Sequence, residues 1–187
     1  MRKIVSLFHR NYDGDRQVRD ELNEEAKWVA NGEGVATRKY DGTCCLIRDG
    51  KLYKRYEVKP GKNPPESFEP ANEVDPNTGK QQGWVPVGEG NEDRWHREAF
   101  DRLAEKEDGT YELMGPKVQS NLETYGEHVL LAHANAVILE DCPRTFNELR
   151  QYLADGKIEG IVWHHEDGRM VKIKGKDFGI KRLPYGG

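Results

Sequence analysis

The lysines with the most suggestive spacing are Lys172 and Lys174, near the end of the sequence. In residues 171–174 they alternate with apolar residues, and this alternation is typical of a strand with one polar face. An Asp-Gly pair at 167–168 predicts a hairpin turn that joins this strand to another over 158–166. Two ammonium groups on one face of a strand can bind phosphate oxygens and stabilise negative charge that develops on them.

A two-residue turn also predicts which side chains share a face with the lysines. Trp163 would pair with Lys172, and Ile161 would pair with Lys174. Glu159 would then lie on the same face. The opposite face would be apolar and would form the core, with Val162, Val171 and Ile173. The ordinary alternative is a solvated face with a surface ion pair, which adds little stability.

A second charged cluster is predicted near the end of an earlier strand. Lys39 lies on a predicted strand over 35–40 and begins a K-x-D-G run. An Asp-Gly turn at 49–50 would join the next two strands and place Arg55 opposite Cys44. A four-residue pattern also arises by chance in a chain with 33% charged residues, so the order of several motifs is more informative than any one of them.

The composition is typical of a polar, loop-rich globular domain. The 187 residues include 35% hydrophobic and 33% charged residues, and the net charge of -4 excludes a strongly basic nucleic-acid binder. The three cysteines include no C-x-x-C pair, which predicts neither a cysteine zinc site nor a disulfide framework. The first ten residues have too short an apolar run for a signal peptide, and we expect a cytoplasmic protein without membrane contact.

Periodicity and turn residues together predict an α+β fold with antiparallel sheets. Helices are expected over 15–30, 92–106 and 145–154. Strands are expected over 35–40, 43–48, 51–58, 110–114, 128–140, 158–166 and 169–174. Residues 59–94 hold most of the prolines and few large apolar residues, which predicts a long irregular excursion.

Five short motifs follow one another in an order that resembles the covalent nucleotidyltransferases, the superfamily of ATP-dependent DNA and RNA ligases and mRNA capping enzymes. They are KYDG at 39–42, Arg55, ELMG at 112–115, EGIV at 159–162 and KIK at 172–174. The longer strings KYDGTCC, GWVPV, YELMG and KIEGIVWH are similar to the vertebrate-type 5′-phosphate/3′-hydroxyl RNA ligase family. This resemblance covers most of the chain.

The resemblance implies a single nucleotidyltransferase (ATP-grasp-like) domain over residues 1–187, with the irregular excursion at about 59–94. In the superfamily this domain has two antiparallel β-sheets with flanking helices, and the nucleotide binds between them. Only residues 175–187 follow the last motif. This is too short for the OB-fold of DNA ligases and capping enzymes, so we expect no OB-fold and an RNA ligase.

The resemblance also implies a reaction and its catalytic residues. A lysine attacks the α-phosphate of ATP, AMP passes to the 5′-phosphate of an RNA, and the RNA 3′-hydroxyl then displaces AMP. Lys39 would be the nucleophile, and Asp41 would orient it or a metal-bound water. Lys172 and Lys174 would bind the α-phosphate oxygens. Since an ordinary lysine is almost fully protonated at pH 7, nearby cations would have to favour the neutral amine of Lys39.

Other residues would bind the nucleotide and a divalent cation. Glu159 resembles the acid that holds the metal, and Glu112 would contact ribose or the metal. Mg²⁺ or Mn²⁺ suits such oxygen ligands. Arg55 would bind ribose or the 5′-phosphate of the RNA. The further residues assigned to the nucleotide are Arg38, Gly42, His133 and Ile161, besides Lys172 and Lys174.

Two positions depart from the family pattern. Arg38 precedes the nucleophile where related ligases often have glutamate, so base choice would rest on backbone groups. The aromatic residue that stacks on the base is not obvious. His133 on the 128–140 strand is the candidate, with Ile161 as the opposite wall, and the alternative for His133 is an ordinary half-buried strand histidine.

The sequence leaves other functions open, together with the oligomeric state. A capping guanylyltransferase or a minimal DNA ligase would use the same motifs, and the nucleotide that becomes attached to the protein would separate them from an RNA ligase. A non-catalytic nucleic-acid-binding module would keep the fold without the reaction. The presence of Lys39, Glu159, Lys172 and Lys174 argues against such a module.

Overall fold

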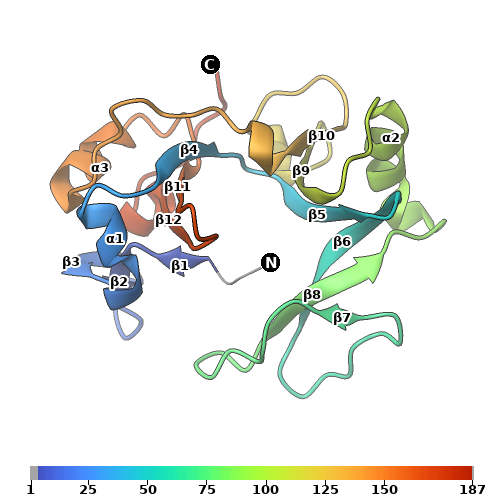
Figure 1. Ribbon diagram of the computed structural model, residues 1–187, viewed down its shortest axis with the longest axis horizontal. Helices are drawn as coiled ribbons and strands as arrows, with labels where there is room; N and C mark the ends of the chain where they lie inside the picture. The colour runs from blue at the N-terminus through green and yellow to red at the C-terminus, as the bar shows by residue number, and fades with distance from the viewer. Residues whose placement is uncertain (1–3, 187) are drawn as a thin grey trace. The chain divides into compact units, whose positions relative to one another are not determined.

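The computed structural model describes residues 4–186, which fold as two compact units. The central unit is the continuous segment Asp41–Asn135. The split unit combines the segments on either side of it, residues 4–40 and 136–186. Each unit has its own sheet (Figure 1). Each unit also has its own apolar core. The few helices and the dominance of antiparallel pairing confirm the predicted α+β class.

The central unit is built on a six-stranded antiparallel sheet with the strand order β10-β9-β5-β6-β8-β7. Its strands are β5 (Thr43–Arg48), β6 (Lys51–Val58), β7 (Glu69–Pro70), β8 (Gln81–Pro86), β9 (Gly109–Met114) and β10 (Val129–Ala132). Its helices are α2 (Arg94–Arg102) and the 3₁₀ turns η2 (Asn91–Asp93), η3 (Gln119–Asn121) and η4 (His133–Asn135). The strand predicted over 128–140 therefore ends early, at Ala132.

The β5–β6 hairpin has the register that its Asp-Gly turn predicts. The turn residues at 49–50 have φ angles of 50° and 70°, and two positive φ angles are what a two-residue type I′ turn requires. Cys45 pairs with Lys54. The same register, continued by one residue, would bring Cys44 opposite Arg55, in agreement with the prediction from the sequence.

The two faces of the six-stranded sheet differ in chemistry. One face is apolar and packs against α2; its buried residues include Cys45, Ile47, Leu52, Tyr111, Leu113 and Leu130. Directly paired residues of antiparallel strands project to the same side of a sheet. Cys44 therefore lies beside its partner Glu112 on the other face, where Arg55 pairs with Trp84.

Residues 59–94 are more regular than the sequence predicts. Strand β8 pairs with β6 along its whole length, and β7 adds a short edge strand to β8. Gly83 and Pro86 lie in β8. Both residue types are poor strand formers, so local propensity hides a strand that cross-strand pairing creates.

The split unit is built on a four-stranded sheet with the order β1-β12-β11-β4, next to a two-stranded hairpin of β2 and β3. Its strands are β1 (Val5–Ser6), β2 (Phe8–Arg10), β3 (Val18–Leu22), β4 (Val35–Lys39), β11 (Gly160–His164) and β12 (Met170–Lys174). Its helices are η1 (Glu24–Ala26), α1 (Lys27–Ala30), α3 (Phe146–Tyr152) and η5 (Gly175–Phe178). β1 runs parallel to β12, and the other pairs are antiparallel.

The helix predicted over 15–30 is wrong in its first half. Val18 and Leu22 begin and end strand β3, and only Lys27–Ala30 form the helix α1. A spacing of four residues fits one face of a helix, but it also fits two steps of the two-residue period of a strand. Pairing of β3 with β2 selects the strand.

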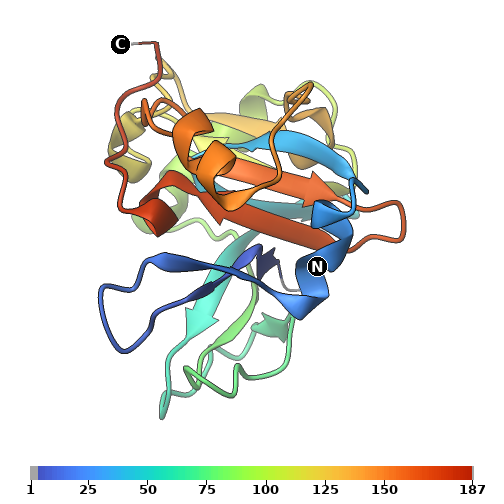
Figure 2. The same ribbon diagram turned by 90° about the vertical axis from the view of Figure 1, so that its left-hand side faces the viewer.

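The β11–β12 hairpin (orange-red strands in Figure 2) has a register that differs from the prediction by one residue. Its loop spans three residues, 166–168, because the backbone hydrogen bond that closes it joins the residues on either side. Trp163 therefore pairs with Val171, and Ile161 pairs with Ile173. Since side chains alternate between faces, a shift of one residue exchanges the two faces of one strand relative to the other.

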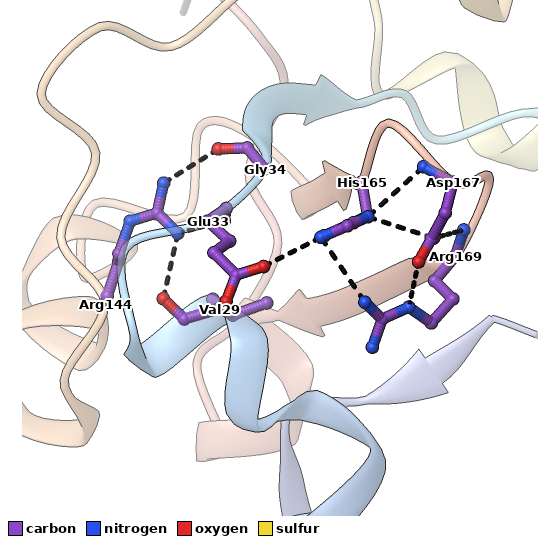
Figure 3. Close-up of polar contacts among 7 residues, drawn as sticks. All are labelled: Val29, Glu33, Gly34, Arg144, His165, Asp167 and Arg169. Carbon is purple, nitrogen blue, oxygen red and sulfur yellow. Dashed lines mark hydrogen bonds and ion pairs between the residues drawn. The ribbon is translucent and has the colours of Figure 1, made fainter.

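Polar contacts at the loop end of this hairpin hold the loop and the start of β4 (Figure 3). The guanidinium of Arg144 donates hydrogen bonds to three backbone carbonyls, those of Val29 (2.9 Å), Glu33 (2.6 Å) and Gly34 (2.9 Å). The ring of His165 contacts the carboxylates of Glu33 at 2.8 Å and of Asp167 at 3.0 Å. These contacts connect the α1–β4 turn to the β11–β12 loop.

The two remaining predicted helices are confirmed with shorter bounds. The helix over 92–106 is α2, preceded by η2, and the helix over 145–154 is α3. Across residues 4–186, no helix combines the length and the apolar character needed to span a membrane.

Candidate active site

The split unit brings Lys39 and Glu159 into direct contact. The Nζ of Lys39 donates a hydrogen bond to Oε2 of Glu159 at 2.7 Å, and the exposed fractions of the two side chains are 23% and 19%. Lys39 is the last residue of β4, and it pairs with Gly160, the first residue of β11. Glu159 directly precedes Gly160, outside the strand, and its carboxylate reaches the lysine at the end of β4.

Gly160 lies between two of the predicted lysines. It pairs with Lys39 on β4 and with Lys174 on β12. A Cβ added at this position would overlap the carbonyl oxygen of Ile173 and press on the backbone of Lys174. The glycine therefore allows the close strand pairing that places Lys39 and Lys174 on the two strands that flank β11.

Lys172 is half-buried and lies two residues before Lys174 on β12, so both project to the same face. Burial, together with the positive charges of Lys174 and Lys39, lowers the pKa of Lys172 from 10.5 to about 8. Three ammonium groups so close together repel one another. An anion bound among them would relieve that repulsion.

Asp177 adds a buried carboxylate beside this cluster, and the sequence analysis did not single it out. Its side chain is 2% exposed, accepts a hydrogen bond from the backbone N–H of Lys174 at 2.8 Å and pairs with Arg10. Its negative charge acts to raise the pKa of Lys172, but burial and the positive charges of Lys174 and Lys39 lower that pKa more. The sequence signal is its place three residues after the N-cap residue Lys174, where a capping-box acid is common.

The predicted orientation of Ile161 is wrong. In the observed register its side chain pairs with Ile173 and is fully buried in the core of the split unit. Val162 takes the position on the lysine face, where it pairs with Lys172. Ile161 therefore supports the sheet from behind and is not a wall beside the lysines.

Arg38 is packed between two aromatic rings. Its guanidinium carbon lies 4.5 Å from the ring centroid of Tyr40 and 3.8 Å from that of Tyr185, and the residue is 8% exposed. Cation–π contacts of this kind fix the guanidinium plane. The residue immediately before Lys39 is thus held rigidly, and its assignment to the nucleotide stays a prediction.

The central unit holds a second group of predicted residues around the buried Glu112. Its Oε2 lies 2.8 Å from Nε2 of His133, and its Oε1 accepts a hydrogen bond from the backbone N–H of Gly42 at 3.1 Å. The prediction that His133 lies on a strand is wrong, because His133 begins the 3₁₀ turn η4 directly after β10. Its other ring nitrogen, Nδ1, lies 2.9 Å from Oγ1 of Thr110.

The remaining predicted residues of the central unit have their own partners. The backbone N–H of Asp41 donates a hydrogen bond to Oε1 of Glu123 at 2.8 Å, and Glu123 is buried. The guanidinium of Arg55 lies over the ring of Trp84, 4.5 Å from its centroid. Glu123 was missed because no local pattern connects it with a residue 82 positions earlier.

The predicted residues thus form one group within each unit. The group in the split unit consists of Lys39, Glu159, Lys172 and Lys174, with Arg38 packed nearby and Ile161 in the core. The group in the central unit consists of Gly42, Glu112 and His133, with Asp41 and Arg55 on the same unit. An amine paired with a carboxylate beside two further ammonium groups can bind a polyphosphate and offer it a nucleophile.

Comparison with known proteins gives a consistent result. The family model described as RNA ligase 1 matches residues 99–185. RNA ligase 1 of Mus musculus is 25% identical over an alignment of 232 positions. The alignment covers 85% of this chain and 71% of the mouse protein. The Rattus norvegicus protein gives the same figures. RNA ligase 1 of Danio rerio is 24% identical over 220 residues, covering 79% of this chain and 68% of the zebrafish protein.

Proposed function

We propose that this chain, which is similar to RNA ligase 1, is an ATP-dependent RNA ligase that works through a lysyl-AMP intermediate on Lys39. Its substrate would be RNA with a 5′-phosphate and a 3′-hydroxyl end, and its fold would be of the nucleotidyltransferase type. The main support is the 2.7 Å contact between Lys39 and Glu159, in one cluster with Lys172 and Lys174.

In the first step, Nζ of Lys39 attacks the α-phosphorus of ATP, an N–P bond forms, and the P–O bond to pyrophosphate breaks. Only the neutral amine can attack, so the ammonium must first lose a proton. The positive charges of Lys172 and Lys174 act against the ammonium form of Lys39, and the negative charge of Glu159 acts in its favour. The carboxylate of Glu159, at hydrogen-bond distance, orients the amine and can pass the proton to solvent.

The same two lysines would stabilise the transition state of this step. Negative charge increases on the non-bridging oxygens of the α-phosphate as the nucleophile approaches, and ammonium groups already in place bind that charge without reorganisation. Lys172 keeps most of its positive charge at pH 7, because its pKa is about 8. Its charge is therefore available for phosphate binding near neutral pH.

In the second step, an oxygen of the RNA 5′-phosphate attacks the phosphorus of the lysyl-AMP, and the N–P bond breaks to release Lys39. In the third step, the RNA 3′-hydroxyl attacks the activated 5′-phosphate and AMP leaves. Arg55, whose guanidinium carbon lies 4.5 Å from the ring centroid of Trp84, would bind the 5′-phosphate or the ribose. Gly42 would contact the nucleotide, and Glu112 and His133 would contact it directly or through an ion that they bind.

A Mg²⁺ or Mn²⁺ ion bound with ATP would neutralise phosphate charge, and Glu159 fits such an ion. One carboxylate, completed by phosphate oxygens and waters, is a common ligand set for Mg²⁺. Glu112 fits less well, because its neighbours are the imidazole of His133 and the thiol of Cys44, and Mg²⁺ prefers oxygen ligands. The proposal therefore assigns the divalent cation of the reaction to Glu159 alone.

The proposal is tested by intact mass after incubation with ATP and either Mg²⁺ or Mn²⁺. We expect one adenylyl group on the wild-type protein, no adduct on Lys39→Ala, and a normal adduct on Lys157→Ala, which removes an exposed lysine of the same unit. Absence of an adduct with either metal would contradict the lysyl-AMP mechanism. A guanylyl adduct with GTP, and none with ATP, would instead indicate a capping-type enzyme.

The choice of substrate is tested separately, with 5′-phosphorylated single strands of RNA and DNA of the same sequence. We expect the RNA to be sealed faster, and a 5′-hydroxyl RNA not to be sealed. Equal rates on RNA and DNA would contradict an RNA ligase and leave the adenylation chemistry intact.

A further inference from the structure

Cys44, Glu112 and His133 of the central unit form a set of ligands for a second kind of metal. One donor atom from each side chain, a sulfur, a carboxylate oxygen and a ring nitrogen, lies within 4.8 Å of the other two. Bonds to zinc measure about 2.3 Å from sulfur and about 2.0–2.2 Å from nitrogen or oxygen. Small side-chain rotations would therefore bring all three atoms to one ion.

The fold places these residues together through cross-strand pairing. Cys44 on β5 and Glu112 on β9 are directly paired, so their side chains stand side by side on the polar face of the sheet. Leu131 on β10 pairs with Glu112 from the other side, and His133 follows at the end of that strand. Two ligands thus come from adjacent strands of the sheet, and the third begins the 3₁₀ turn η4 directly after the next strand, β10. Ligands on or beside regular strands are positioned better than ligands on a long loop.

Hydrogen bonds already orient two of the three ligands. The backbone N–H of Gly42 holds Oε1 of Glu112 and turns Oε2 toward His133. The hydroxyl of Thr110 lies at Nδ1 of His133. A hydroxyl can accept as well as donate, so it can bind the Nδ1–H tautomer and leave Nε2 as a metal ligand. Outer contacts of this kind are typical of metal-binding histidines.

The donor atoms favour a transition metal over magnesium. Thiolate and imidazole are the ligands that zinc-class ions prefer, whereas Mg²⁺ prefers oxygen. Glu112 is 7% exposed, and among the described residues its carboxylate contacts the ring of His133 and the backbone N–H of Gly42. A buried carboxylate with so little compensating charge gains stability from a bound dication.

We propose that Cys44, Glu112 and His133 bind one zinc-class divalent transition metal ion, with water or an added ligand in the fourth position. Three protein ligands and one open position are typical of zinc sites that remain accessible. Binding would release the thiol proton of Cys44 and displace the direct contact between Glu112 and His133. C-x-x-C spacing does not predict this site, because its ligands are separated by 68 and 21 residues.

Cobalt(II) is the probe, because a thiolate ligand gives it a charge-transfer band in the near ultraviolet and tetrahedral geometry gives it strong visible bands. The full chain, reduced and freed of metal with a chelator, is titrated without ATP or RNA. We expect a 1:1 complex with both sets of bands and loss of both bands when Zn²⁺ is added. Since no nucleotide is present, failure of the proposed ligase activity would not affect this result.

Substitutions distinguish Co²⁺ binding at this site from binding by the other two cysteines. Cys44→Ser should lose the charge-transfer band, whereas Cys142→Ser in the split unit and Cys45→Ala on the opposite face of β5 should keep it. Thr110→Val should weaken Co²⁺ binding about 10- to 100-fold, and Thr110→Ser, which keeps the hydroxyl, should restore it. Circular dichroism of each variant shows that the fold is retained.

Three outcomes would overturn the proposal. The first is the absence of a charge-transfer band in the wild-type protein, and the second is a band that Cys44→Ser leaves unchanged. The third is displacement of Co²⁺ by Mg²⁺ at a similar concentration, which would indicate an oxygen-ligand site instead. Should Cys44→Ser fail to fold, His133→Asn provides the same test through loss of the tetrahedral visible bands.

Discussion

Removal of the charge of Lys172 should stabilise the split unit at neutral pH. Burial and the charges of Lys174 and Lys39 lower the pKa of Lys172 from 10.5 to about 8. Because one pKa unit corresponds to about 1.4 kcal/mol, the folded protein carries a penalty of up to about 3 kcal/mol when this lysine is protonated. Lys172→Met keeps most of the side-chain volume and removes that penalty.

The sign of the pH dependence follows from proton binding. Between about pH 8 and 10.5 the unfolded chain keeps the proton of Lys172, and the folded chain has lost it. The unfolded state then binds more protons, so the free energy of unfolding of the wild type rises with pH through this window. The advantage of Lys172→Met should therefore be largest near pH 7 and should shrink by up to about 3 kcal/mol as the pH approaches 10.5.

Urea unfolding of the two proteins at several pH values measures this difference, with Lys157→Met as the control for removing an exposed lysine from the same unit. A ¹³Cε NMR titration of the wild type, assigned through the signal missing in Lys172→Met, gives the midpoint directly. A constant difference in stability between pH 7 and 10, or an NMR midpoint near 10.5, would refute the electrostatic reasoning.

Two further changes test the framework around the lysines. Gly160→Ala should destabilise the split unit by about 1–3 kcal/mol, because the new Cβ overlaps the carbonyl oxygen of Ile173, and urea unfolding that matches the wild type would contradict the close pairing of β11 with β12. Arg144→Ala should cost about 2 kcal/mol through loss of its hydrogen bonds to three carbonyls. Thermal unfolding measures that cost, and an effect no larger than that of the exposed Arg150→Ala would show that the three bonds do not hold the turn.

The two hairpins show what local sequence can predict. In β5–β6 the Asp-Gly pair forms a two-residue turn, and the strands pair in the predicted register from Arg48 with Lys51 to Cys45 with Lys54. In β11–β12 the same dipeptide lies in a three-residue loop, held by contacts of His165 with Glu33 and Asp167. Glu33 is 132 positions away in the sequence, so nothing in the hairpin itself could indicate the longer loop.

The candidate site likewise combines contacts that the sequence predicts with contacts that it does not. The contact of Lys39 with Glu159 was predictable, because the motifs of a family imply which residues meet, although their catalytic roles stay predictions. Glu123 and Asp177 were not predictable in this way, since each is a buried acid that accepts a hydrogen bond from a backbone N–H, and no family motif indicates such a contact. The cluster of Cys44 with Glu112 and His133 depends on the pairing of three strands, which spacing within one strand does not reveal.

The division of the chain also bears on the order in which the protein folds during synthesis. All strands of the six-stranded sheet belong to one uninterrupted segment, so that sheet can close as soon as Asn135 has left the ribosome. Strand β4, in contrast, has to wait for β11, more than a hundred residues later. The segment that carries Lys39 is therefore made early and receives its partners last, and until then it remains exposed to chaperones and proteases.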